Sequence, residues 1–266
     1  MVALIEQTGS LFRARALCWV LTRREVTARY AGTALGVLWA YLQPCLTIAA
    51  YYLVFDVVFA MRMGPGSPTQ AVGTYLIAGM LPWMAFADAL SRSMASLIES
   101  AGVLQKNALP PMLFPLRAVL ASAVVYAPLL LLLVVAYLPL HGLALALITF
   151  PVLVGLQMLL CVLWGAVLAI LAAALRDTLQ IVAFILSLGI FLSPVLFPAH
   201  LFPQGWAWVL WVNPMTAWVN GYQAVLLQGA WPGTAVWVGI AAWLGAGALF
   251  LEVLLRRSHD QLVDWL

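Results

Sequence analysis

The run of residues 29 to 59, RYAGTALGVLWAYLQPCLTIAAYYLVFDVVF, constrains the fold of this chain more than any other stretch, because Asp56 is the only charged residue between Ala34 and Ala60. A helix of about 20 apolar residues, rising about 1.5 Å per residue, crosses the hydrocarbon core of a bilayer. Residues 34 to 60 are therefore predicted to form a transmembrane helix. Polar and aromatic groups are more frequent in this helix than contact with lipid requires, so we expect part of its surface to face something other than lipid.

The whole chain shares this apolar character, since 65% of its 266 residues are hydrophobic and 8% are charged. Soluble domains carry about 25% charged residues, so the chain is predicted to be an all-α integral membrane protein. Its formal charge of +3 is small and its basic residues are dispersed, which argues against a nucleic-acid partner. Cys18, Cys45 and Cys161 lie far apart and are expected to be apolar filler rather than disulfides or metal ligands.

Polar, Gly-rich or Pro-rich breaks separate further apolar segments. Six transmembrane helices are expected, at about residues 34–60, 71–90, 112–138, 143–175, 179–197 and 234–255. The arginine-rich residues 1–30 are expected to form an interfacial helix in the headgroup layer, and a basic tail held by anionic lipid is the alternative. Residues 91–111 are the longest polar break, with a short helix over 91–100, and residues 256–266 form a polar tail.

The basic residues predict the orientation, because cytoplasmic loops carry an excess of Lys and Arg. With six spans and a cytoplasmic N-terminus, 11 of the 12 Lys and Arg residues lie on the cytoplasmic side and Arg62 alone lies outside. Both termini are therefore expected in the cytoplasm. Residues 198–232 contain no Lys, Arg, Asp or Glu but several Trp residues, and a seventh span there would export Arg256 and Arg257. We interpret them as a re-entrant segment on the outer side, broken at Asn213-Pro214.

No catalytic constellation is apparent in the sequence. His141, His200 and His259 have no partner at metal-ligand spacing and are interpreted as polar surface residues. Lys106, in VLQKNAL, is the only lysine, and the glycines of a phosphate-binding loop are missing around it. The chain is therefore expected to be no enzyme, to bind no cofactor or metal, and to depend on another source of energy for any work it does.

Two aspartates in the spans are candidates for function, because a charge at mid-membrane costs about 3 kcal/mol. Asp88 lies four residues before Arg92, so an i,i+4 ion pair is the favoured explanation. Asp56 lies near the outer end of the first span, where an interfacial position beside Arg62 and a position facing a pore are both open.

The aromatic residues of the first span also have two interpretations. Tyr41, Tyr51, Tyr52 and Phe55 recur along it, and aromatic faces stack against the C–H surfaces of sugars. Aromatic residues that anchor a helix at the interface or pack against its neighbours are more common in membrane proteins. A ladder of sugar-stacking faces in a polymer channel therefore competes with simple packing.

Five strings, in order along nearly the whole chain, resemble one family. They are RREVTARYAGTALGVLWAYLQP at 23–44, GMLPWMAF at 79–86, LPPMLFPLRAVL at 109–120, SPVLFP at 193–198 and VNPMTAWVNGYQAVLLQG at 212–229. The chain resembles the membrane subunits of ABC-2-type exporters of bacterial cell-surface polysaccharides, the O-antigen and capsule permeases, with teichoic-acid exporters as relatives. It departs from them before the third span, where Lys106 stands in place of a more basic stretch.

The resemblance implies a homodimer in the bacterial inner membrane, with two copies of a separate ATP-binding subunit that hold ATP and Mg²⁺. The implied substrate is a lipid-linked polysaccharide, O-antigen first and capsule next. The channel would be lined by Trp39, Tyr41, Tyr51, Tyr52, Phe55, Phe184 and Phe191. Contact with the ATPase would fall to Arg23, Arg24, Leu97, Ile98, Glu99 and Lys106. An outer gate would contain Trp211, Asn213, Pro214 and Trp218.

Other classes of membrane protein fit the sequence less well. A transferase acting on lipid-linked sugars needs paired carboxylates or a His–Asp pair at a membrane edge, and Asp177 and Glu252 stand apart in the sequence. A secondary transporter typically shows paired broken helices in two repeated halves, whereas the sequence has one broken segment and no repeat. An exporter of teichoic acid or of a small molecule stays open as an alternative.

Overall fold

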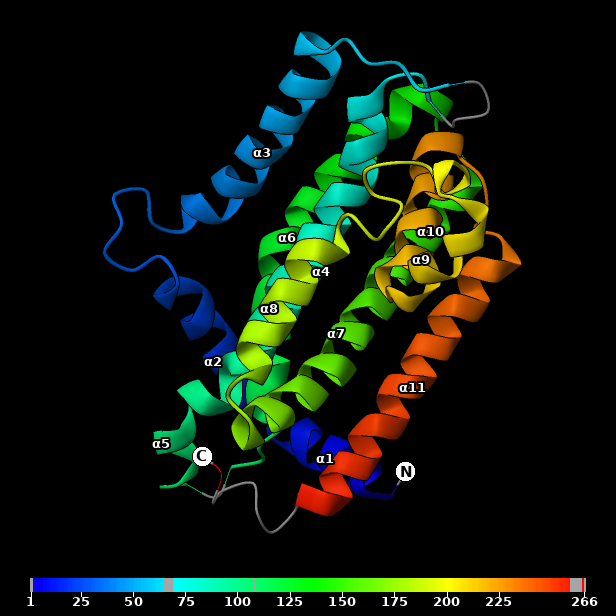
Figure 1. Ribbon diagram of the computed structural model, residues 1–266. Coiled ribbons are helices and arrows are strands. Elements are labelled where there is room, and N and C mark those ends of the chain that lie inside the picture. Colours follow the sequence, from blue (N-terminus) through cyan, green and yellow to red (C-terminus); the bar gives the residue numbers. More distant parts are fainter. Residues whose placement is uncertain (1, 65–68, 108, 259–264, 266) are drawn as a thin grey trace.

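The protein is described from a computed structural model that places residues 2–64, 69–107, 109–258 and 265. Apart from an isolated bridge between Arg62 and Ala71, the regular structure of these residues is helical. The chain is thus all-α, as the sequence predicts (Figure 1). Its α-helices are α1 (Val2–Arg13), α2 (Arg15–Ala28), α3 (Trp39–Tyr52), α4 (Val72–Glu99), α5 (Ala101–Leu104), α6 (Leu113–His141), α7 (Thr149–Ala174), α8 (Thr178–Gly189), α9 (Trp208–Val212), α10 (Met215–Gln228) and α11 (Thr234–Ser258).

Four of the predicted spans are helices that are long and apolar enough to cross a membrane. They cover Gly36–Val58, Leu113–His141, Leu145–Ala174 and Thr234–Ser258. The first joins α3 to a 3-10 turn (Gly36–Leu38) and a π-helix (Leu53–Val58), and the third joins α7 to a 3-10 turn (Leu145–Ile148). The chain is therefore a multi-pass membrane protein. The remaining two predicted spans correspond to α4 and α8, which do not meet the same criterion, so the count of six stays a prediction.

Two elements differ from the helices that the sequence suggests. The fifth span was expected over residues 179–197, but α8 ends at Gly189. Pro194 has no N–H to donate to the carbonyl of Ile190 and restricts the residue before it, and that carbonyl accepts a hydrogen bond from the hydroxyl of Ser193 at 2.9 Å. The side chain of Asn213 donates to the carbonyls of Gly189 and Leu192. The break expected over 91–111 is also shorter, because α4 continues as one helix to Glu99 and only then passes into α5.

The N-terminal segment forms two helices in place of the single helix expected over residues 1–30. The chain breaks at Ala14, between α1 and α2. Cys18 and Thr22 on α2 are buried, and α2 packs along α6, while α1 contacts α11. Figure 1 shows α1 and the end of α11 at the same end of the bundle. The first and last helices are thereby fixed side by side.

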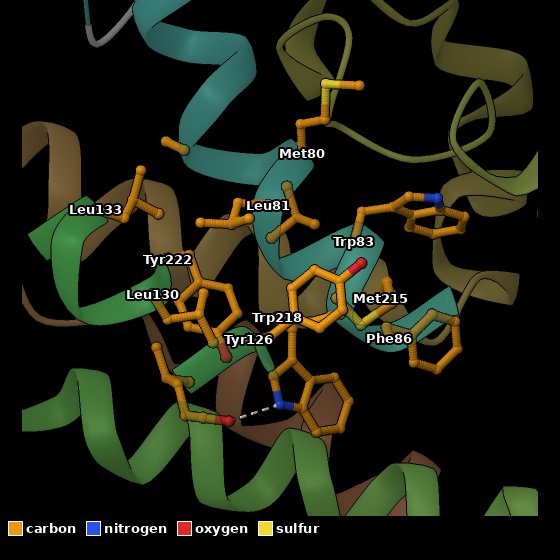
Figure 2. Close-up of a cluster of buried hydrophobic side chains, with 14 of the residues drawn as sticks. Met80, Leu81, Trp83, Phe86, Tyr126, Leu130, Leu133, Met215, Trp218 and Tyr222 are labelled. Carbon is orange, nitrogen blue, oxygen red and sulfur yellow. Dashed lines mark hydrogen bonds between the residues drawn. The ribbon is translucent and has the colours of Figure 1, made fainter. Parts of the chain in front are cut away.

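The core surrounds α4, which packs against α6, α7 and α10. Small residues of α4, among them Ala78 and Ala85, are fully buried and let these helices approach closely. Trp218 of α10 is fully buried in the cluster shown in Figure 2, where its Nε1 donates to the carbonyl of Leu153 at 3.2 Å. A buried polar chain crosses the same core, because Tyr222 donates to Gln157 at 2.8 Å and Gln157 donates to the Pro82 carbonyl at 2.9 Å.

In contrast, α3 stands away from this core (Figure 1). Only 11% of the apolar window of Gly36–Val58 is buried, compared with 56% of the window of Leu145–Ala174. On α3 itself, Ala40 and Pro44 are the buried residues. A large apolar surface of the first span is thus left uncovered by its own chain.

Candidate functional site

A group of charged side chains surrounds Asp88, on α4. One of its oxygens, Oδ1, accepts a hydrogen bond from Nε of Arg92 at 2.7 Å. The other, Oδ2, accepts one from Nη1 of Arg29 at 3.3 Å and one from the hydroxyl of Ser122 on α6. Asp88 therefore joins the end of α2 to α4 and α6.

The Asp88–Arg92 contact confirms the ion pair that the sequence predicts. The second arginine, Arg29, was not predicted as a partner of Asp88. Its side chain is 4% exposed, and its partner Asp88 lies 59 residues away in the chain. The sequence did contain a signal that Asp88 needs partners, since an aspartate in an apolar helix requires strong donors. It did not identify Arg29 as one of them, because no local pattern reveals a pairing across 59 residues.

Glu25 and Arg117 extend the cluster beneath Arg29. Glu25 lies 3.8 Å from Nε of Arg29 and 3.7 Å from Nη2 of Arg117. Arg117 also donates to the hydroxyl of Ser100 at 2.9 Å and lies over the ring of Phe114. Burial lowers the pKa of the Arg29 guanidinium from its ordinary value, and the charge of Asp88 opposes that shift. Arg29 is thus held in an environment that penalises its charge.

A small cavity of about 130 Å³ opens beside these charges. Arg29, Asp88 and Arg92 line it on one side. The other lining residues come from the start of the first span and from α4 and α6, and they include Tyr30, Gln43, Pro44 and Tyr126. The cavity is therefore polar, and it lies where the N-terminal segment, the first span and the central helices meet.

The carboxylate of Asp56 has a partner that neither interpretation of it included. Its Oδ1 accepts a hydrogen bond from the backbone N–H of Gly73 at 3.0 Å, in the first turn of α4. Such a carboxylate satisfies one of the free donors at a helix N-terminus and favours the helix dipole. Arg62 instead donates to the carbonyl of Met61. Asp56 is a cap for α4.

The aromatic residues proposed for the channel do not share one face of the helix. Trp39 and Tyr52 are exposed, whereas Tyr41 and Tyr51 pack against the core, and Phe55 stacks on Tyr51 with ring centroids 6.1 Å apart. On the other predicted channel segment, Phe184 of α8 and Phe191 just after it are 64% and 57% exposed. The predicted ladder is thus divided between an inward and an outward side of the first span, and its role in a channel stays a prediction.

The residues proposed for contact with an ATPase divide in a similar way. Leu97 is wholly buried in a cluster with Leu104 and Leu113, so its assignment to an external groove is wrong. The sequence predicts a separate short helix over residues 91–100, whereas these residues up to Glu99 continue α4 and pack with it in the core. Ile98 is partly buried against Met94, Ala172 and Val182. The side chains that are exposed are Arg23, Arg24, Glu99 and Lys106.

One of the four residues predicted for the outer gate does not lie at the surface of the protein. Trp218 is fully buried in the core, which leaves it no surface to close a channel. The break predicted at Asn213-Pro214 is present, because α9 ends at Val212 and α10 begins at Met215. Asn213 holds this break by accepting a hydrogen bond from the Met215 N–H at 3.0 Å. Trp211 is exposed, and Pro214 lines an apolar cavity of about 410 Å³ between α4, α7, α8 and α11.

The two histidines that the structure describes, His141 and His200, belong to no group of side chains that could hold a metal ion. His141 contacts the carbonyls of Gly142 and Leu226 through its two ring nitrogens, at 3.0 and 2.9 Å, and thereby links α6 to α10. His200 is exposed at the rim of a polar cavity of about 240 Å³ that Asn220 and Gln223 also line. His259 lies outside the described residues. Within the described ranges, no three His, Cys, Asp or Glu side chains are grouped so that they could hold a metal ion.

Comparison with known proteins places this arrangement among transport proteins. The sequence profile of the family described as ABC-2 type transporter matches residues 16–227. The chain is 30% identical over 236 residues to the O-antigen export system permease protein RfbA of Myxococcus xanthus, covering 86% of this chain and 87% of that protein. A protein of the same name from Klebsiella pneumoniae is 24% identical over 79% of this chain and 80% of its own length. The polysialic acid transport protein KpsM of Escherichia coli is 25% identical over 77% of this chain and 79% of its own length.

Proposed function

Because this chain belongs to the ABC-2 type transporter family, we propose that it is the permease subunit that exports a lipid-linked cell-surface polysaccharide across the inner membrane, with O-antigen as the first candidate. The observation that carries the proposal is the 30% identity to the Myxococcus xanthus O-antigen export permease along 86% of the chain. Capsular polysaccharide is the second candidate, because the similarity to the polysialic acid transport protein extends over 77% of the chain.

In the proposed transporter, ATP is hydrolysed by two copies of a separate subunit with bound Mg²⁺, since the sequence has no phosphate-binding loop. The contact surface consists of exposed residues at the end of the bundle where α4 turns into α5. They are Glu99, Val103, Gln105 and Lys106, with Arg23 and Arg24 of α2 as further candidates. In the proposal this end faces the cytoplasm, because α1 and the end of α11 lie there (Figure 1) and carry Arg13, Arg256 and Arg257 in their last turns.

Two permeases would form the channel in this proposal. The apolar and aromatic surfaces that α3 and α8 leave uncovered support such a pairing, since Trp39, Tyr52, Phe184 and Phe191 are all exposed there. A second copy would shield part of these surfaces and leave the rest to the polysaccharide. The segment around Trp211 and Asn213 would narrow the outer mouth.

The experiment is a deletion of the gene in its host, complemented from a plasmid. Loss of surface polysaccharide with accumulation of lipid-linked polysaccharide inside the cell is expected, and the intact gene should restore export. A matched control strain carries the intact permease with an ATPase whose phosphate-loop lysine is changed to alanine, and it should behave like the deletion. Unchanged surface polysaccharide in the deletion strain would refute the proposal, and an altered resistance to small compounds instead would favour a small-molecule exporter.

A further inference from the structure

The cavity beside Asp88 carries more positive than negative charge. One carboxylate, Asp88, contacts both Arg29 and Arg92 directly, and all three side chains line the cavity. The neighbouring carboxylate, Glu25, is itself shared between Arg29 and Arg117. Three guanidinium groups thus share two carboxylates and leave one positive charge in excess. Because a buried charge is costly unless it is paired, the cavity is complementary to an anion.

Arg29, which lines this cavity, has a side-chain nitrogen without a hydrogen-bond partner. Its side chain is 4% exposed, yet its buried Nε has no hydrogen-bond partner. Glu25 lies 3.8 Å from that nitrogen, too far for a hydrogen bond. Nη1 of Arg29 lies 3.3 Å from Asp88 and Nη2 of Arg29 lies 3.5 Å from the hydroxyl of Ser122, and both distances are long for a charged donor. This guanidinium is therefore buried without being fully bonded.

The size and the lining of the cavity favour a phosphate group. Its volume of about 130 Å³ is well below the roughly 300 Å³ at which pockets for drug-sized ligands begin, so an oligosaccharide does not fit. The planar donor fork of arginine matches phosphate oxygens in pairs. Tyr30, Gln43 and Tyr126 add hydroxyl and amide groups to the lining. A small, multiply charged oxyanion is the ligand that these groups suit.

The position of the cavity indicates that the phosphate belongs to a lipid. Arg29 precedes the apolar span that begins at Gly36, whereas Gln43 and Pro44 lie about two helical turns inside that span, so the cavity extends from the start of the span into it. Basic pockets between transmembrane helices on the cytoplasmic side bind phosphate headgroups. We propose that the Arg29–Arg92 cavity binds a phosphate group carried by a membrane lipid. Resting on the proposed function, this is the phosphate that joins the polysaccharide to its lipid carrier.

The test measures binding of farnesyl diphosphate, a short prenyl diphosphate, to the purified full-length permease in phosphatidylcholine nanodiscs by isothermal titration calorimetry. The variant Arg92→Gln should weaken binding at least about tenfold, the loss expected for one charged hydrogen bond. Arg29→Gln should do the same, and gel filtration with a melting curve shows that each variant is folded. The matched control is Arg13→Gln, an exposed arginine on α1, which should bind as the unchanged protein does.

A variant of opposite sign separates ligand binding from loss of structure. Asp88→Asn removes the carboxylate that competes for the two arginines, so it should bind farnesyl diphosphate at least as tightly as the unchanged protein. Weakening by Asp88→Asn as large as that by Arg92→Gln would mean that the arginines are structural and would overturn the proposal. Equal binding of uncharged farnesol, or equal weakening by Arg13→Gln, would overturn it as well.

Competition identifies where the phosphate comes from. Inorganic pyrophosphate that binds as tightly as farnesyl diphosphate would overturn the assignment to a lipid. Phosphatidylglycerol that displaces farnesyl diphosphate at equal concentration would support a lipid phosphate but overturn the assignment to the polysaccharide carrier. The assay needs no ATPase and no export, so a chain that binds through Arg92 but restores no polysaccharide would refute the proposed function and leave the site in place.

Discussion

At the scale of single residues, polar side chains in this protein hold helices together where lipid offers no partner. Asp56 caps α4, Gln157 bridges α4 and α10, and Asn213 holds the break between α9 and α10. Each satisfies backbone or amide groups that would be costly to leave unpaired in a membrane. Their contribution can be measured one side chain at a time.

The buried polar chain across the core gives a first prediction. In Tyr222→Phe the Oε1 atom of Gln157 loses the donor that lies 2.8 Å away and stays buried. The free energy of unfolding of the purified protein in detergent should then be lower by about 1 kcal/mol, the usual contribution of a hydrogen bond between membrane helices. Tyr52→Phe, at an exposed tyrosine, serves as the control and should unfold as the unchanged protein does. An equal effect of both changes would contradict the role given to Gln157.

The cap on α4 gives a second prediction. A Cβ at Gly73 would lie 3.0 Å from Tyr52 Cδ2 and closer still to the carboxylate of Asp56. Gly73→Ala therefore forces Asp56 out of its hydrogen bond and should lower the free energy of unfolding by about 1 kcal/mol, the usual loss for a helix cap. Gly155→Ala, where a Cβ meets nothing within 4 Å, should be neutral or stabilising. Thermal melting of the two purified variants in one detergent decides this.

At the scale of helices, hydropathy located most elements, because a run of about 20 apolar residues has few stable alternatives to a helix in lipid. The ends of helices were less predictable. The sequence pattern did not show that α4 continues to Glu99, since its polar residues Ser93 and Ser96 looked exposed but are buried against neighbouring helices. The early end of α8 has a local cause in Pro194, but the bonds from Asn213 that hold it come from a distant segment.

This correction moves the predicted contact with the ATPase onto α5. Val103 is 47% exposed on that helix, whereas Leu97 is buried one helix earlier. Val103→Asp should leave the amount of folded permease unchanged and reduce export, because a charge disrupts an apolar contact with the partner. Leu97→Asp should instead lower the amount of folded protein, since it places a charge in the core. Surface polysaccharide per folded permease, measured by gel and fluorescence-detected gel filtration, distinguishes the two.

The first span gives a prediction about the two sides of one helix. Tyr51→Leu should reduce stability, because Tyr51 packs against the core and stacks on Phe55. Tyr52→Leu should spare stability and weaken export only in part, because a ladder of stacking faces tolerates the loss of one. Changing Trp39, Tyr52, Phe184 and Phe191 to Leu together tests the ladder further. Normal export from that well-folded variant would rule out sugar stacking on these helices.

At the scale of the whole molecule, the arrangement of helix ends bears on orientation. The start of α1 and the end of α11 lie together, and the turns after α6 and α10 lie at the opposite end (Figure 1). In a cysteine-free background, Leu143→Cys, at a residue that is 88% exposed in the turn after α6, should react with a membrane-impermeant maleimide added to cells. Gln105→Cys, exposed after α5, should react only after the cells are opened. The reverse result would invert the proposed topology.

The candidate site illustrates what a sequence conveys about a membrane protein as a whole. Asp88 and Arg92 were recognisable because they lie one helical turn apart in an apolar helix. Arg29, Ser122 and Gln43 join them only after four segments have packed, and nothing in the local pattern links those segments. The charges in the first half of the chain therefore serve two purposes: they orient the chain in the bilayer and they form a pocket. A count of basic residues cannot separate these two purposes.

The loose packing of α3 also affects the life of the protein before assembly. With 11% of its apolar window buried by its own chain, the first span gains little from folding in isolation. Under the proposed pairing, a newly made copy holds this helix by a few contacts until a second copy arrives, and during that interval it is open to the proteases that clear unassembled membrane subunits. The cellular amount of such a permease then follows the rate at which copies meet, more closely than the rate at which they are synthesised.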